Sequence, residues 1–333
     1  MSEKYTVVIP VRDEGSDLDQ TIANIAETQT QCAAILVERD TAGAGTAATR
    51  HAGTLRAQTE TIITIDAHMR FKPGSLDLMA EFLAEDRKRV CCLSCRTNPE
   101  CDFTGPVYRG ANLREWGGEY ALEPKWRRGE PGEVACLMGA CYGFSREFYE
   151  SLGSPWSLGR GWGCDETLLS IPARLAGGSV HVLPDECAHR LKTPVDVKYR
   201  QTDAEIAAIW YTRFALLEYV RPANREALRR RMRKSANCPR LDAAVKRAAE
   251  QLDRVRVLSW EEYAARWLTS GESPEVPVPA KRDRLPSVAD PGIRCPHCGG
   301  ISDRHPVTNT YANGNRRRLC ANCGRPFVTR FGR

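Results

Sequence analysis

The 333-residue sequence lacks any apolar run long enough to cross a membrane, and its first residues lack the features of an export signal. No stretch approaches the ~18 consecutive apolar residues that a membrane-spanning helix requires. The apolar run that ends near Val11 is too short for the hydrophobic part of a signal peptide. We therefore expect a soluble, cytoplasmic protein without a membrane span.

The chain also lacks the context of a disulfide-stabilised protein, although it contains 14 cysteines. Disulfide frameworks are typical of short secreted chains, and this chain is long and has no export signal. We expect a reducing compartment, in which most of the cysteines are free thiols. Four clustered cysteines are predicted to be buried thiols rather than metal ligands: Cys91, Cys92, Cys95 and Cys101.

Charge is unevenly distributed along the chain. Residues 1–220 contain 24 Lys and Arg against 31 Asp and Glu, a net charge of −7, whereas residues 221–256 contain 12 against 4, a net charge of +8. Residues 290–333 contain 8 against 2, a net charge of +6. An acidic first part is thus followed by a basic second part, which requires an explanation of its own.

Strand-like and helix-like segments alternate over the first 190 residues, a pattern typical of an α/β fold with a doubly wound, mostly parallel sheet. Helices are expected from Ser16, where Ser16-x-x-Asp19 is similar to a capping box, and from Ser75 to about Glu85. The stretch 98–133 is predicted to be a long irregular excursion. Pro172 is predicted to kink the helix that follows Asp165-Glu166. Four segments are predicted to be strands: Tyr5–Val11, Ala33–Glu38, Thr61–Ile65 and Val90–Ser94.

One of these strands ends in an acid-x-His pair. The apolar run Thr61–Ile65 leads directly to Asp66 and His68. A buried parallel strand delivers such residues to the carboxyl edge of the sheet, where α/β proteins place their ligands. Side chains at positions i and i+2 of an extended chain point the same way, so Asp66 and His68 can share one divalent cation. A cap or turn role for Asp66 is the alternative.

Several segments within residues 5–190 resemble those of the GT-A glycosyltransferases, especially family 2 and the related polypeptide N-acetylgalactosaminyltransferases. Glu38-Arg39 stands where that family usually has two aspartates, and Gly139-Ala140 replaces the usual Gly-Gly. The order and spacing of the segments carry the resemblance. They are, along the chain, Val7–Glu14, Ile35–Gly53, Asp66–His68, and a set formed by Met138–Phe144, Gly161–Glu166 and Ala188–His189.

The resemblance implies a GT-A domain over residues 1–200 that binds a nucleotide-sugar, most readily a UDP-sugar. It also implies a Mn²⁺ or Mg²⁺ ion held by Asp66, His68 and His189. The alternative for His189 is a surface or capping histidine. The implied donor-binding residues are Pro10, Arg12, Glu14, Glu38, Arg50, Asp66, Gly139 and Trp162. Trp162 is either a stacking platform for the sugar or a core residue.

Asp165 and Glu166 are the candidates for acid–base catalysis. A carboxylate within hydrogen-bond reach of an acceptor hydroxyl can remove its proton as the new bond forms. The resemblance to inverting family 2 enzymes assigns the base to Glu166, whereas the retaining N-acetylgalactosaminyltransferases would place Asp165 against the sugar. Both acids also suit the N-terminal end of a helix.

The second part of the chain predicts a helical basic extension over residues 201–270 and a linker over 271–292, which holds five of the 20 prolines. A small zinc ribbon is predicted over 293–333, because two Cys-x-x-Cys pairs separated by 21 residues fit tetrahedral Zn²⁺. Its ligands would be Cys295, Cys298, Cys320 and Cys323. The ribbon resembles those of insertion-element transposases and of the ribonucleotide-reductase repressor, which bind DNA.

Basic side chains accompany both of these segments. The run 229–234 has five Arg and Lys residues and is interpreted as part of a nucleic-acid-binding surface. The alternative is a solvated helix face. In the ribbon, an Arg cluster beside an aromatic residue suits phosphate contacts and stacking. The predicted nucleic-acid-binding residues of the ribbon are Arg316, Arg317, Arg318 and Arg325.

Together these features favour a glycosyltransferase that acts on DNA, with the hydroxyl of a hydroxymethyl-pyrimidine as acceptor, as in phage DNA hypermodification. For a phage gene the compartment would be the host cytoplasm. One alternative is a glycosyltransferase for a protein or cell-surface precursor, with the ribbon as a docking module. Another is a DNA-binding regulator whose transferase domain is inactive. The sequence predicts neither the sugar nor the oligomeric state.

Overall fold

The computed structural model describes residues 4–116, 121–190, 202–220 and 241–268, together with five short strands between residues 293 and 329. The chain divides into two compact units, Met1–Glu272 and Ser273–Arg333. In the described part of the chain, no helix is long and apolar enough to cross a bilayer.

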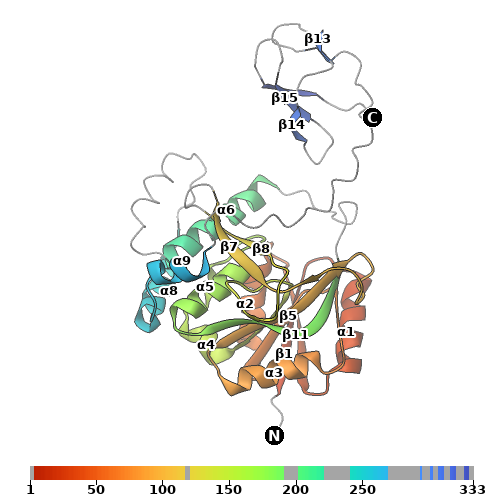
Figure 1. Ribbon diagram of the computed structural model, residues 1–333, viewed down its shortest axis with the longest axis vertical. Coiled ribbons are helices and arrows are strands. Elements are labelled where there is room, and N and C mark those ends of the chain that lie inside the picture. Colours follow the sequence, from red (N-terminus) through yellow and green to blue (C-terminus); the bar gives the residue numbers. More distant parts are fainter. Residues whose placement is uncertain are drawn as a thin grey trace. The chain divides into compact units, whose positions relative to one another are not determined.

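The first unit is built on a mixed β-sheet (Figure 1). Strands β1 and β2 are parallel, and so are β1 and β3, but β10 runs antiparallel between β3 and β5. The prediction of a mostly parallel sheet is therefore only partly right: β5 and β11 are also parallel, but the sheet is mixed. Apolar periodicity reports burial and not strand direction. The order is β2 (Cys32–Arg39), β1 (Tyr5–Val11), β3 (Thr61–Ile65), β10 (Cys141–Ser145), β5 (Arg89–Asn98), β11 (Ser179–Arg190) and β4 (Met69–Phe71).

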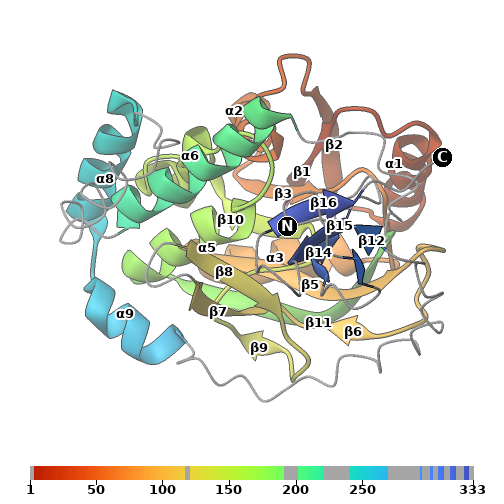
Figure 2. The ribbon, with the colours of Figure 1, turned by 90° about the horizontal axis from the view of Figure 1, so that it is seen from above.

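Each face of the sheet has its own hydrophobic core. On one face Val7 and Ile9 pack with apolar residues of α1 (Ser16–Thr28) and α3 (Ser75–Glu85). On the other face Val8 belongs to a core that includes Trp156. That core is covered by α2 (Thr46–Arg56), α4 (Arg146–Ser151), η1 (Pro155–Leu158), α5 (Asp165–Leu175), α6 (Asp203–Val220), α8 (Ala243–Val255) and α9 (Trp260–Trp267). Figures 1 and 2 both place α6, α8 and α9 on the opposite side of the unit from α1.

The stretch predicted to be irregular contains a β-hairpin. Strands β7 (Ala111–Trp116) and β8 (Ala121–Trp126) pair with each other, β6 (Val107–Tyr108) pairs with β5, and β9 (Gly132–Glu133) pairs with β11. Leu113 and Leu122 of the hairpin are buried in the core of the α5 face. Their burial fixes the excursion on the body of the unit, which the Gly- and Pro-rich composition did not predict.

One predicted helix feature, the capping box of α1, is wrong. Helix α1 does begin at Ser16, but Gly15 is its N-cap, with a φ of 56° and no side-chain capping bond, so the capping box is absent. The apolar stripe of α6 is buried only in its second half: Phe214 is buried, whereas Ile206 is 40% exposed. Helix α5 contains Pro172 in its last turn and ends at Leu175.

The buried carboxylate of Asp77 connects α3 to the neighbouring strands. It accepts hydrogen bonds from the Tyr5 hydroxyl (2.8 Å), from the backbone N–H of Thr30 (2.9 Å) and its hydroxyl (2.8 Å), and from the N–H of Gln31 (3.1 Å). Burial opposes ionisation of Asp77, but these hydrogen bonds outweigh it and lower its pKa. The folded state therefore favours the charged form.

Replacing Asp77 by asparagine is expected to lower the free energy of unfolding by about 2 kcal/mol at pH 7, because the amide NH₂ faces groups that donate. A lowered folded-state pKa stabilises the protein above the unfolded value of about 4 and loses that effect as pH falls through the folded value. Urea unfolding at pH 7 and pH 3 should show the difference shrinking at the lower pH. The exposed-site control Glu27→Gln should change stability by less than about 0.5 kcal/mol, and a pH-independent effect of Asp77→Asn would contradict the assignment.

The second unit contains short antiparallel strands. Strand β12 (Ile293–Arg294) pairs with β13 (Ile301–Ser302), and β14 (Val307–Thr310), β15 (Arg316–Leu319) and β16 (Pro326–Thr329) form a three-stranded sheet. Arg316, Arg317 and Arg318 lie on β15. The basic run 229–234 lies outside the described residues. So do the other predicted residues of the second unit, which are Cys295, Cys298, Cys320, Cys323 and Arg325. The zinc ribbon stays a prediction.

Candidate metal and donor site

The candidate site lies where β3 ends. Asp66 is the first residue after β3, and its N–H donates to the carbonyl of Ala140 at 2.9 Å. Ala140 reaches this position with a φ of 62°, in the left-handed region that a non-glycine residue adopts at a cost of about 1–2 kcal/mol. The backbone at Gly139-Ala140 thereby fixes Asp66 at the edge of the sheet.

The pairing of β4 with β11 brings the third predicted ligand to the other two. His189 lies opposite Met69, the residue after His68, and the Arg190 N–H donates to the His68 carbonyl at 3.0 Å. One potential ligand atom from each of Asp66, His68 and His189 lies within 4.8 Å of those of the other two. The structure therefore brings together three residues that are up to 123 positions apart in the sequence.

The three side chains fit a divalent cation. The imidazole rings of His68 and His189 have centroids 4.7 Å apart, and His189 Nε2 lies 3.5 Å from Asp66 Oδ2. Among the described residues, the buried atom His189 Nε2 has no hydrogen-bond partner. A buried polar atom without a partner is costly, and a metal ion would satisfy it. One carboxylate and two imidazoles suit Mn²⁺ better than Ca²⁺.

A buried arginine lies behind the candidate metal ligands. Arg50 is 2% exposed, and its guanidinium contacts Asp66 Oδ1 at 2.5 Å and Asp165 Oδ2 at 3.5 Å. It also lies over the rings of Tyr142 and Trp156, at 4.8 and 5.8 Å from their centroids. Arg50 was predicted to contact the donor, but the structure places it inside the protein as the shared partner of two carboxylates.

These contacts separate the pKa values of the two carboxyl groups. Burial opposes ionisation of Asp66, but the contact with His189 and the charge of Arg50 outweigh it and hold its pKa well below the usual range. Burial raises the pKa of Asp165, and the charge of Arg50 offsets only part of that effect. Asp66 is thus charged and ready to bind a cation at neutral pH.

Asp165 and Glu166 have different surroundings at the start of α5. Asp165 is 5% exposed and faces Arg50, whereas Glu166 is half-buried and accepts a hydrogen bond from the Tyr142 hydroxyl at 2.8 Å. Of the two acids, Glu166 is the one that an acceptor from solvent can reach. Sequence reasoning missed Tyr142, because a tyrosine in a short buried strand gives no signal beyond core packing.

Three of the other predicted donor-binding residues lie on β1 and β2 or directly after β1. Arg12, at the end of β1, forms an ion pair with Glu205 of α6 at 3.0 Å, a partner that the sequence did not indicate. Glu38 forms an ion pair with Arg56, and it lies opposite Pro10 in the pairing of β1 with β2.

Exposure excludes one of the two predicted alternatives for Trp162. The side chain is 72% exposed, so Trp162 is not a core residue. Gly161 and Gly163 on either side have φ values of 68° and 96°. Gly139 also has a positive φ, of 109°, and a Cβ there would lie 2.7 Å from Cys95 Cβ. This crowding gives a structural reason for glycine at position 139.

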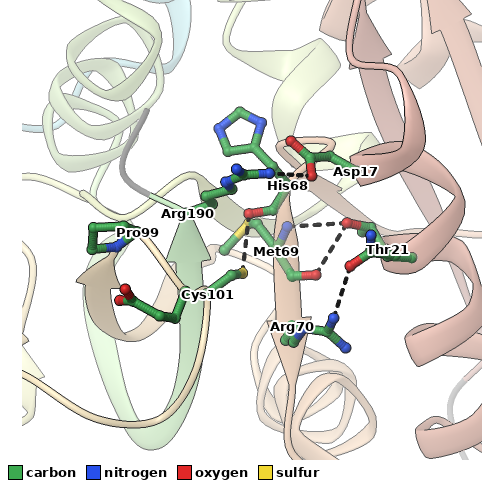
Figure 3. Close-up of a pocket in the computed structure, with 10 residues that line it drawn as sticks. Asp17, Thr21, His68, Met69, Arg70, Pro99, Cys101 and Arg190 are labelled. Carbon is green, nitrogen blue, oxygen red and sulfur yellow. Dashed lines mark hydrogen bonds and ion pairs between the residues drawn. The ribbon is translucent and has the colours of Figure 1, made fainter. Parts of the chain in front are cut away.

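A polar pocket of about 270 Å³ borders His68 on the side of α1 (Figure 3). Arg190 Nη1 contacts Asp17 Oδ1 at 2.7 Å on its wall, and the Cys101 thiol donates to the His68 carbonyl at 3.4 Å. Cys101 is buried and free, as predicted, and so are Cys91, Cys92 and Cys95. These contacts hold the backbone of His68 in place.

Residues 7–153 match the family model described as glycosyl transferase family 2. This segment lies within the first unit and covers less than half of the 333-residue chain. The matched segment includes Asp66 and His68 and ends before Glu166 and His189. The search of the curated proteins found no match.

The fold is similar to that of solved glycosyltransferases. The structure of GalNAc-T7 with UDP, GalNAc and Mn²⁺ is 13% identical, with a TM-score of 0.61, and the match covers 79% of this chain and 56% of that one. The chain thus spans little more than half the length of that enzyme. TarS 1-349 of S. aureus with UDP-GlcNAc is 12% identical (TM-score 0.42), over 79% of this chain and 91% of that one. The mannosyltransferase PcManGT of Pyrobaculum calidifontis with GDP-Man and Mn²⁺ is 12% identical (TM-score 0.40), over 80% and 87%.

Proposed function

We propose that the protein is a metal-dependent glycosyltransferase that moves a sugar from a nucleotide-sugar to a hydroxyl acceptor. The observation that supports it most is the convergence of Asp66, His68 and His189 at one end of β3, in a unit with a segment that matches the family 2 model. Asp66 and His68 lie within the segment that matches the family model, whereas His189 lies outside it and joins them only through the fold. Because GalNAc-T7 was solved with UDP and Mn²⁺, UDP-sugars and Mn²⁺ are the first donor and cation to test.

In this proposal Asp66, His68 and His189 would hold the cation. A bound divalent cation would stabilise the negative charge that develops on the donor phosphates as the sugar leaves. Arg50 keeps Asp66 charged and correctly placed through its 2.5 Å contact. Arg12 and Trp162 are exposed, and in this proposal they contact the phosphates and the sugar, respectively.

Glu166 is the proposed general base. The bond between sugar C1 and the diphosphate oxygen breaks, the bond between C1 and the acceptor oxygen forms, and the acceptor proton moves to the Glu166 carboxylate. The hydrogen bond from Tyr142 orients Glu166 for this step. Attack by the acceptor on the face opposite the leaving group would invert the configuration at C1. Asp165 positions Arg50 and does not contact the acceptor.

For the acceptor we propose DNA that carries hydroxymethyl-pyrimidines. The support comes from the sequence: the net charge of +8 over residues 221–256, the paired cysteines suited to Zn²⁺, and the arginines of β15. Basic segments of this kind bind the phosphate backbone. The enzyme would have to unstack the modified base to reach its hydroxyl, at a cost of a few kcal/mol.

The full-length protein should add a sugar to DNA containing 5-hydroxymethylcytosine or 5-hydroxymethyluracil when supplied with Mn²⁺ and UDP-sugars. Digestion to nucleosides and mass spectrometry would detect the added sugar, and unmodified DNA of the same sequence is the matched control. DNA binding should also weaken steeply between 50 and 200 mM salt, as expected when basic groups contact several phosphates. Hydrolysis of the donor without transfer to either modified DNA would reject DNA as the acceptor and leave the transferase proposal intact.

A further inference from the structure

A second carboxylate contacts the candidate metal centre from outside its ligand set. Glu14 lies in the turn between β1 and α1, and its Oε2 is 3.3 Å from Nδ1 of His68. Both side chains are largely buried, at 11% and 12% exposure. The resemblance to other glycosyltransferases assigned Glu14 to the donor, but this contact directs its carboxylate toward an imidazole.

The backbone fixes Glu14 in this position. The Glu14 carbonyl accepts the N–H of Asp17 at 3.3 Å, in the first turn of α1. Gly15 follows with a φ of 56°, and this left-handed turn starts the helix directly after Glu14. Because β1 is paired on both sides, with β2 and β3, Glu14 lies between a firmly held strand and a helix.

Glu14 is not a member of the group whose ligand atoms converge. The potential ligand atoms of Asp66, His68 and His189 are mutually within 4.8 Å, and the carboxylate of Glu14 does not join that group. The two ring nitrogens of a histidine point in different directions, so Nδ1 of His68 faces Glu14 while Nε2 remains for a cation. A ligating histidine commonly donates its other ring N–H to a carboxylate, which fixes the tautomer and makes the ligating nitrogen more basic.

We propose that Glu14 is a positioning residue that orients His68 for divalent-cation binding, rather than a residue that binds the nucleotide. The inference rests on the proposed metal site. It predicts that the charge of Glu14 tightens cation binding without contributing to the affinity for the nucleotide itself. Loss of such a partner weakens metal binding by about 10–100-fold in other metal sites.

The test is the affinity of the full-length protein for Mn²⁺ alone, measured by electron paramagnetic resonance of the free ion. Glu14→Gln, which keeps the shape and a carbonyl oxygen, should raise the Mn²⁺ dissociation constant about 10-fold or more. The control is Asp13→Asn, which removes the same charge from the exposed neighbouring residue and should leave the dissociation constant within about 2-fold, since exposed charges are screened. UDP binding without metal should be equal in all three proteins.

Three outcomes would be decisive. A lowered melting temperature of metal-free Glu14→Gln, with unchanged Mn²⁺ affinity, would assign Glu14 a structural role and overturn the inference. Weaker UDP binding without metal would return Glu14 to the donor site. The variant His68→Ala separates this inference from the proposed function. If His68→Ala retains Mn²⁺ affinity, the proposed metal site is wrong. If His68→Ala loses Mn²⁺ affinity and Glu14→Gln retains it, only the proposed role of Glu14 is wrong.

Discussion

Replacing Asp66 by asparagine should abolish Mn²⁺ binding and lower sugar transfer by more than about 10³-fold. The amide cannot supply the negative charge that holds a cation between two imidazoles, and charge stabilisation by a metal contributes several kcal/mol to the transition state. The substitution also removes the 2.5 Å contact with Arg50, which leaves that buried guanidinium with Asp165 alone. Breaking a buried ion pair destabilises a protein by about 3–5 kcal/mol, so the melting temperature of Asp66→Asn should fall as well.

His68→Ala separates the two effects of Asp66→Asn. His68 belongs to the same ligand group, but among the described contacts the guanidinium of Arg50 is paired with Asp66 and Asp165. His68→Ala should therefore lose Mn²⁺ affinity and transfer while its metal-free melting temperature falls less than that of Asp66→Asn. Titration with Mn²⁺ and thermal unfolding of both variants are the measurements. Transfer that persists in either variant without added metal would contradict the proposed role of the cation.

The sequence predicted the parts of the site that depend on local pattern. An apolar strand followed by acid-x-His predicted that Asp66 and His68 lie together, and they do, although residues 67 and 68 form a bend between β3 and β4 and not an extended chain. The strands Tyr5–Val11 and Thr61–Ile65 were predicted with the bounds that the structure has. His189 was predicted only through the resemblance, since nothing in its own neighbourhood shows that β11 will pair with β4.

The parts that failed depend on contacts between distant segments. The antiparallel direction of β10 was not predicted, because the five residues Cys141–Ser145 give the same apolar signal in either direction. The role of Arg50 was also missed: an arginine on a helix is expected to reach solvent, and only the packing of α2 against β1 and η1 brings it to 2% exposure between two carboxylates. Its burial requires two acids that lie 99 positions apart in the sequence.

Glu166→Gln should reduce the turnover of the transferase by about 10²–10⁴-fold, the usual contribution of a general base. The affinities for Mn²⁺ and UDP should stay unchanged, because Glu166 is not one of the three converging ligands. Tyr142→Phe, which removes the 2.8 Å hydrogen bond to Glu166 but keeps the carboxylate, should cause a smaller decrease. Single-turnover kinetics with saturating donor would measure the chemical step directly.

The comparison with Asp165→Asn decides between the two acids. Asp165 is buried against Arg50, so Asp165→Asn should be less stable than the parent protein. The molecules of Asp165→Asn that remain folded should keep most of the turnover. A base must reach the acceptor, and in this geometry the half-buried Glu166 can do so while the 5% exposed Asp165 cannot. If instead Glu166→Gln stays active and Asp165→Asn loses turnover without losing stability, Asp165 contacts the sugar, and the retaining course of the N-acetylgalactosaminyltransferases becomes the better description. The anomeric configuration of the product, read by nuclear magnetic resonance, would then show retention.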